Sequence, residues 1–320
     1  MGGFVCCAES GSRMAPAGAI RLSTDVLDCD GGAAFSMDMY STAASPSFPL
    51  RKAAARRPWC TYAFIAANIT LMVALFAMGG WAVDDFQHNQ LIGPPTSVLQ
   101  RFSGSRAAIV DDGEHWRLFT SIWLHAGIVH LLLNMGALYR AGSDIELEHG
   151  LLTFLSLYLF SGLCGSFASA VFGLPNQVTV GASGALFGLF GSDLAYFVHY
   201  YADLGPSRWT FFAVFLVSSI VGLGLGLHPM LNNFAHIGGF IGGVLFSMVC
   251  LSRFQTIRGQ PWLKYNSRTL ALCVAFAVLA LAYAGGLAYL LFVSKVHGYT
   301  ICPWCRYLDC WETSWWTCPA

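Results

Sequence analysis

The 320-residue chain is 56% hydrophobic, and only 11% of its residues are charged. Soluble domains carry about a quarter charged residues, so this composition excludes an ordinary soluble protein. The formal net charge is zero, which gives no support for a nucleic-acid partner.

Apolar residues gather in seven runs, each close to the roughly 20 residues that a helix needs to span a bilayer. All seven are expected to be helical, because lipid offers the backbone no hydrogen-bond partner. The predicted fold class is an all-α polytopic membrane protein. Its predicted spans are 59–79, 119–139, 151–173, 182–200, 210–227, 234–251 and 270–293.

The spans divide the chain into five regions. Residues 1–57 are rich in Ala, Ser and Gly without a sustained period, which predicts a disordered region. A six-helix core at 58–252, a basic loop at 253–268, a seventh transmembrane helix at 269–294 and a Cys-rich tail at 295–320 are expected to follow.

Basic residues cluster in two segments that are separated by six predicted spans and therefore share one side of the membrane. The positive-inside rule makes that side cytosolic, so we expect a cytosolic N-terminus and a lumenal C-terminus. Acidic residues near the N-terminus argue against a mitochondrial transit peptide, and we predict the secretory pathway (Golgi or plasma membrane). The clusters are Arg51, Lys52, Arg56 and Arg57, and Arg253, Arg258, Lys264 and Arg268.

Four cysteines crowd the C-terminal tail, on the predicted lumenal side. That side is oxidising in the secretory pathway, which favours two disulfides. A redox or zinc role for the single CxxC motif is the weaker alternative. The four residues are Cys302, Cys305, Cys310 and Cys318.

Polar side chains inside spans are costly, so each one needs a reason. Ser183 opens the fourth predicted span, where free backbone N–H groups could stabilise an oxyanion. A helix-capping serine is the common alternative. His236 lies in the sixth span, at a similar predicted depth, and histidine is the usual base for a serine nucleophile. Small residues on both spans, among them Gly184 and Gly239, favour close packing of the two helices.

The second predicted span carries three further polar residues. His130 and Asn134 are one helical turn apart, face the same way and can both donate hydrogen bonds. His125 is expected roughly 140° further around the same helix. Hydrogen bonding between helices is the alternative role. Zinc binding is less favoured, because the chain lacks an HExxH motif.

Taken together, these motifs resemble the rhomboid family of intramembrane serine proteases over roughly residues 59–252. The motifs are Trp116-Arg117, His125…His130…Asn134, Gly181-Ala182-Ser183-Gly184 and Ala235-His236-Ile237-Gly238-Gly239. The seventh span resembles the eukaryotic secretase type, and the Cys- and Trp-rich tail is similar to that of plant rhomboid-like proteins.

The resemblance implies that the protein cleaves single-span membrane proteins near the lumenal end of their span, within the lipid bilayer and without a cofactor or metal. It implies Ser183 as nucleophile, His236 as general base, and His130 and Asn134 as oxyanion donors. The implied supporting residues are His125, Arg117, Phe187, Gly181, Gly184, Gly239 and Gly243. Many members have Tyr where this chain has Phe187.

Two other functions stay open. A catalytically inactive rhomboid-like protein could bind membrane clients, although such relatives usually lose the serine or the histidine. A channel or transporter is the second alternative, because histidines inside spans are also found along ion pathways.

Overall fold

A computed structural model describes residues 57–174, 177–201, 204–254, 267–313 and 318. All of them belong to one unit of the chain, Ala44–Ala320. The predicted disordered region 1–57 and the predicted basic loop 253–268 lie outside the described residues, except at their edges.

The described part of the chain is helical, with no strand and one isolated antiparallel bridge. The long helices are α1 (Trp59–Met78), α5 (Ile128–Ala137), α7 (Leu151–Phe172), α8 (Ser183–His199), α9 (Arg208–Leu225), α10 (Asn233–Phe254) and α11 (Ser267–Ala288). Helix α5 runs on through η2 (Leu138–Gly142) and α6 (Ser143–His149), and α11 runs on through η4 (Tyr289–Val293). The short elements are α2 (Thr96–Gln100), α3 (Arg106–Val110), α4 (Arg117–Thr120), η1 (Ser121–Trp123), η3 (Gly205–Ser207), α12 (Gly298–Ile301), η5 (Pro303–Cys305) and α13 (Arg306–Asp309).

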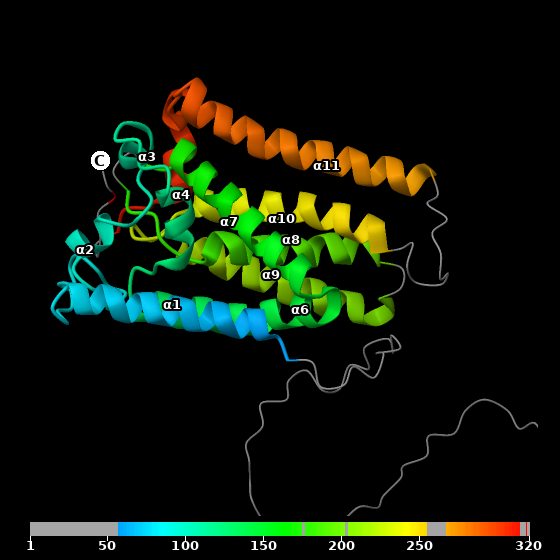
Figure 1. Cartoon of the computed structure of the whole chain (residues 1–320), viewed down its shortest axis with the longest axis horizontal. Helices are drawn as coiled ribbons and strands as arrows, with labels where there is room; N and C mark the ends of the chain where they lie inside the picture. The colour runs from blue at the N-terminus through cyan, green and yellow to red at the C-terminus, as the bar shows by residue number, and fades with distance from the viewer. Residues whose placement is uncertain (1–56, 175–176, 202–203, 255–266, 314–317, 319–320) are drawn as a thin grey trace, which may run out of the picture. The chain divides into compact units, whose positions relative to one another are not determined.

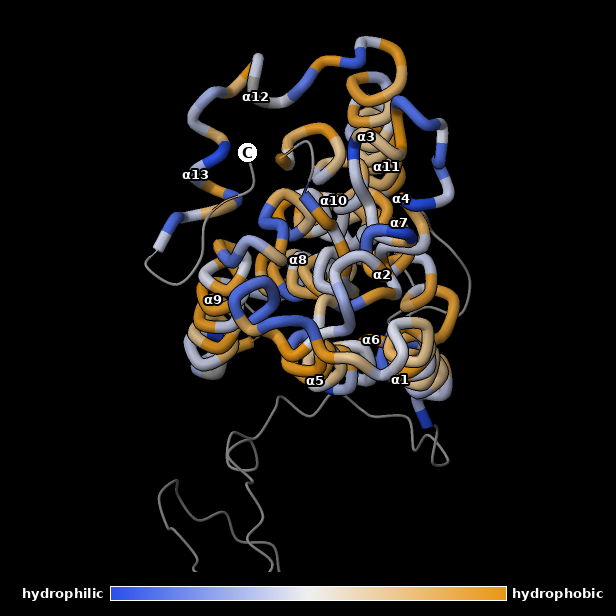
Figure 2. The backbone as a smooth tube through the Cα atoms, turned by 90° about the vertical axis from the view of Figure 1, so that its left-hand side faces the viewer, coloured by the Kyte–Doolittle hydropathy of each residue, from blue (hydrophilic) through white to orange (hydrophobic). Residues whose placement is uncertain are grey.

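Five of these helices are long and apolar enough to cross a membrane, namely α1, α7, α9, α10 and α11 with η4. A sixth is added if the bent pair Arg117–Trp123 and Ile128–His149 counts as one span. In Figure 2 the long helices carry mostly hydrophobic residues, drawn in orange. Hydrophilic residues, drawn in blue, lie in many of the segments that connect them. The protein is thus an integral multi-pass membrane protein, as predicted. Its division into a six-helix core and a seventh span stays a prediction.

The second predicted span, 119–139, is wrong in its shape. The chain bends by 86° between Trp123 and Ile128, and the helix that follows continues to His149. The preceding loop causes the break, because Ile128 N–H donates to Ile92 O at 3.0 Å and Asn89 Nδ2 donates to Ala126 O at 2.7 Å. Backbone contacts made far along the chain leave no periodic signal in the sequence.

Helix α8 packs against both α7 and α10, and the three run side by side in Figure 1. The contact with α10 leaves no room for side chains. A Cβ on Gly239 would lie 1.9 Å from Gly184 O, and one on Gly243 would lie 2.1 Å from Gly188 O. Small residues therefore bring the two helix backbones together.

A buried carboxylate binds the N-terminal end of α1. Glu146 of α6 accepts hydrogen bonds from the backbone N–H groups of Cys60 and Thr61 and from the Thr61 hydroxyl, at 2.8 to 3.0 Å. These donors belong to the first turn of α1, where unpaired N–H groups and the helix dipole favour a negative charge. Glu146 thereby fixes α1 against α6.

The segment from α12 to α13 lies at the same end of the bundle as α2, α3 and α4 (Figure 1). Two disulfides close it, Cys302–Cys305 and Cys310–Cys318. Gly298 begins α12 against the end of α7, where a Cβ would lie 2.6 Å from Phe172 Cα. The tail therefore packs on the bundle.

Candidate active site

Ser183 is the first residue of α8 and directly follows a tight turn. Gly181 has φ = 134°, a conformation that favours glycine, and its N–H donates to Ser121 O at 2.9 Å. Ala182 occupies the capping position, and no side-chain cap hydrogen bond is made there. Helix capping therefore does not account for this serine, and the N–H groups of the first turn have no acceptor within the helix.

His236 lies in the first turn of α10, close to the start of α8. A Cβ on Gly184 would lie 3.1 Å from Ala235 O. The neighbour of Ser183 therefore touches the neighbour of His236. The close contact between the two helices places serine and histidine at the same level, as the small-residue pattern predicts.

The hydrogen bond between the two side chains is not formed in this structure. His236 Nε2 is buried and has no hydrogen-bond partner among the described residues. Ser183 is partly exposed. Catalytic hydrogen bonds are often long in unliganded enzymes and tighten when substrate binds.

Two polar side chains of α5 lie next to each other near this turn. His130 Nε2 and Asn134 Nδ2 lie 3.0 Å apart, and both residues are buried. The position that a Cβ on Gly181 would take lies 3.1 Å from His130 Nε2 and 3.3 Å from Ser183 Oγ. The missing side chain of Gly181 thus leaves a gap between the histidine and the serine.

His125 does not lie on the helix that carries His130, so the expected 140° offset is wrong. It sits in the break between η1 and α5, where it is buried, and both of its ring nitrogens lack a partner within the described part of the chain. Its ring meets that of His130 edge to face, with centroids 5.1 Å apart. His125 therefore supports the position of His130.

Asn233 is a partner of His236 that lies outside the motifs found in the sequence. Its Oδ1 lies 3.1 Å from His236 Nδ1, one helical turn before the histidine. The spacing of three residues at a helix start is the signal that could have pointed to it. On the other side, the Phe187 ring stacks on the imidazole, with centroids 4.3 Å apart and planes 8° apart. His236 is thus held both in the plane of its ring and across its face.

The candidate site lies within a stretch of the chain that matches a known protein family. The family model described as the Rhomboid domain matches residues 112–253. RHOMBOID-like protein 7 of Arabidopsis thaliana is 33% identical, over 82% of this chain and 91% of that protein. The chain belongs to the rhomboid family. Inactive RHOMBOID-like protein 8 of the same plant is 31% identical over 75% of this chain and 72% of its own length. The rhomboid protease GluP of Bacillus subtilis is 36% identical over 58% of this chain and 34% of its own length.

Arg117 holds together the first loop of this rhomboid protein. Its Nη1 donates to Gln100 O and Ser103 O, both at 2.8 Å. Its Nε pairs with Glu114, and its guanidinium group lies over the Trp116 ring at 4.8 Å. Because Arg117 is buried, these contacts hold the loop before η1 in one place.

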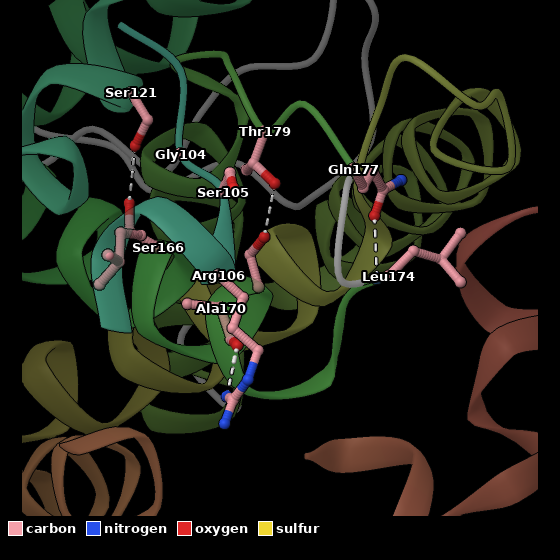
Figure 3. A pocket seen from close by; sticks show the side chains of 11 residues that line it. Gly104, Ser105, Arg106, Ser121, Ser166, Ala170, Leu174, Gln177 and Thr179 are labelled. Carbon is pink, nitrogen blue, oxygen red and sulfur yellow. Dashed lines mark hydrogen bonds between the residues drawn. The ribbon is translucent and has the colours of Figure 1, made fainter. Parts of the chain in front are cut away.

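A small pocket lies behind the turn that carries Ser183 in the rhomboid fold (Figure 3). Gly104 and Thr179 pair through both backbone hydrogen bonds at its edge, two residues before Gly181. Hydroxyl groups meet across it, Ser121 with Ser166 at 3.3 Å and Ser169 with Thr179 at 2.8 Å. The cavity has a volume of about 10 Å³, and a polar cavity of that volume holds about one water molecule.

Proposed function

We propose that this rhomboid protein is an intramembrane serine endopeptidase with Ser183 as nucleophile and His236 as general base. The observation that supports the proposal is the contact between Gly184 and Ala235, the chain neighbours of Ser183 and His236, at the N-terminal ends of two packed helices. The unpartnered Nε2 of His236 supports it, because a general base needs a free lone pair.

In the proposed reaction, His236 Nε2 takes the proton of Ser183 Oγ as that oxygen bonds to the scissile carbonyl carbon. The carbonyl oxygen becomes an oxyanion, which the Ser183 N–H, His130 and Asn134 would stabilise by hydrogen bonds. The C–N bond then breaks, and His236 returns the proton to the leaving amine. Water, activated by His236, hydrolyses the acyl-enzyme and restores the Ser183 hydroxyl.

The proposed substrates are single-span membrane proteins that are cut near the lumenal end of their span. A helix hides its carbonyl groups in its own hydrogen bonds, so the substrate must unwind locally before attack. Gly or Pro lowers the cost of unwinding by roughly 1 to 3 kcal/mol per residue. We therefore expect substrates with small, helix-weakening residues at that end to be preferred over uniform Leu helices.

The deciding experiment is co-expression of the full chain with model single-span substrates. Wild type should release the lumenal fragment, whereas Ser183→Ala and His236→Ala should each abolish release without loss of membrane insertion. Near wild-type cleavage by Ser183→Ala would falsify the assignment. Labelling of Ser183 by a fluorophosphonate gives a second readout.

We further propose seven spans, with a cytosolic N-terminus and a lumenal C-terminus in the secretory pathway. The two basic clusters support this orientation. Maleimide labelling of sealed vesicles should find the tail cysteines protected until reductant is added, and then reactive only from the lumenal side. Labelling from the cytosolic side would contradict the orientation.

A catalytically inactive, client-binding protein is the second candidate. The serine–histidine hydrogen bond is absent from this structure, and one relative carries the word inactive in its name. Binding without cleavage predicts that wild type and Ser183→Ala capture the same membrane proteins and that neither reacts with a fluorophosphonate.

A further inference from the structure

The C-terminal tail reaches the helix that carries His236. We use the name C-terminal cap for residues 298–310, the part of the tail that runs from the start of α12 to the first cysteine of the second disulfide. The cap lies at the N-terminal end of α10, with α13 in contact with that helix. Helix α12 contacts α7, and Figure 2 shows α12 and α13 at the edge of this end of the bundle.

Asp309 is the buried contact of the cap. It is fully buried, and its Oδ1 accepts a hydrogen bond from Asn233 N–H at 2.8 Å. Its Oδ2 lies 3.4 Å from Asn232 Nδ2, and Asn232 Oδ1 in turn caps the helix by accepting from Ala235 N–H at 3.0 Å. The carboxyl group therefore lies at the N-terminal end of α10, where free N–H groups need acceptors.

Leu308 supplies a second contact, which fixes the amide of Asn233. Asn233 Nδ2 donates to Leu308 O at 2.8 Å and to Leu223 O of α9 at 3.0 Å. Both partners are carbonyl oxygens, so the amide cannot be turned the other way round. Its Oδ1 therefore faces His236 Nδ1 as a hydrogen-bond acceptor.

An acceptor at Nδ1 decides which imidazole nitrogen carries the proton. A neutral histidine has one N–H, and here it must point from Nδ1 to Asn233 Oδ1. Nε2 then carries the lone pair, which is the form that a general base requires. The cap thus holds Asn233 at two points, because Leu308 O binds its amide and Asp309 binds its backbone N–H.

We infer that the C-terminal cap holds His236 in its Nδ1–H form through Asn233, and that Asp309 is a positioning residue for the general base. The effect on cleavage rests on the proposed function, whereas the effect on the tautomer does not. The cap thereby links a disulfide-closed segment outside the family-matched region, residues 112–253, to the chemistry of the site.

The test uses the full-length protein in detergent micelles, with ¹⁵N-labelled histidine, and assigns the His236 signals by comparison with His236→Ala. Wild type should show the Nδ1–H tautomer. Asp309→Ala should shift His236 toward a mixture of tautomers, while Asp309→Asn, whose amide oxygen can still accept from Asn233 N–H, should retain the wild-type signal. Glu312→Ala is the matched control, an exposed acidic residue three positions further along the tail. An unchanged tautomer in a folded Asp309→Ala protein overturns the inference.

Cleavage kinetics give the second readout. Loss of the partner that orients a metal-bound histidine typically costs about 10- to 100-fold in activity. By the same reasoning, kcat of Asp309→Ala should fall by about 10-fold or more with KM unchanged. Because the effect passes through Asn233, adding Asp309→Ala to Asn233→Ala should lower kcat no further. An additive loss, or a rise in KM alone, overturns the positioning role.

The two failures are distinguishable. If wild type and Ser183→Ala are equally inactive, the protease proposal falls and the tautomer measurement alone decides the inference. If wild type cleaves and Asp309→Ala cleaves equally well, the protease stands and the inference falls. A melting measurement on each variant separates either result from unfolding.

Discussion

His236 is flanked by two helix contacts of different kinds. On one side, α10 meets α8 backbone to backbone, and Gly239 and Gly243 leave no room for a Cβ. On the other side, α9 and the residue after it contact side chains of the site. Gly222 lies against the Phe187 ring, and both Leu223 O and Gly226 lie against the Asn233 amide. No residue of α9 is buried, whereas half of the residues of α10 between Asn233 and Cys250 are buried. The first contact sets where the serine and histidine lie, and the second sets how the histidine ring is held.

The largest effect is expected from breaking the backbone contact. Gly239→Val would force its Cβ to 1.9 Å from Gly184 O, and no rotamer can relieve a clash with backbone. We expect a cost of more than about 3 kcal/mol and little folded protein. Gly285→Ala in α11 is the control, because nothing lies within 4 Å of its Cβ position. That change should stabilise the helix by about 0.5 to 1 kcal/mol. Thermal unfolding of both variants measures the difference, and equal melting temperatures would refute the tight-contact account.

Second in size is Gly181→Ala, which should fold but not cleave. The new methyl group would lie 2.8 Å from His130 Cε1, between that ring and Ser183 Oγ. It fills the space proposed for the oxyanion, so kcat should fall by about 100-fold or more. The strained φ adds about 1 to 3 kcal/mol of instability. Cleavage assays corrected for folded protein check the claim, and a loss explained wholly by unfolding would contradict it.

The sequence predicts the contact between α8 and α10 well, for a physical reason. Helix periodicity and small residues are local properties, so the helix faces on which the glycines of α8 and α10 lie follow from spacing alone. His130 and Asn134 share a face for the same reason.

What the sequence misses depends on contacts between distant segments. The break at 124–127 exists because residues 89–92 bind the backbone there, which turns the predicted straight span into two helices. Likewise, Asn233 acquires its orientation from Leu308, 75 residues away. No period or motif encodes a partner at that distance, so these features appear only once the chain is folded.

The side-chain contact of α9 should give a smaller effect when it is overfilled. In Gly222→Ala the methyl group would lie 2.7 Å from Phe187 Cζ and would push the ring against the imidazole. Because α9 is peripheral, it can move outward, so we expect a loss of kcat of at most about tenfold, equivalent to about 1.4 kcal/mol. Gly224→Ala, in the same helix with nothing within 4 Å, should cleave like wild type. Similar losses in both variants would mean that helix propensity, rather than the Phe187 contact, governs the result.

The last expected effect concerns stability rather than cleavage, and is a pH dependence that arises from the cap, the other contact at the start of α10. Burial raises the pKa of the Asp309 carboxyl from 3.8 to about 7, against the opposing effect of the N–H groups of α10 that hold it. The folded protein therefore keeps a proton on Asp309 between about pH 4 and 7 that the unfolded chain has lost. The folded state binds more protons in this window, so stability should fall as pH rises through it and level off above pH 7. Asp309→Asn cannot ionise, and its melting temperature should decline less across the same window. Parallel curves for wild type and Asp309→Asn would show that other groups produce the dependence and that the Asp309 carboxyl ionises freely in the fold.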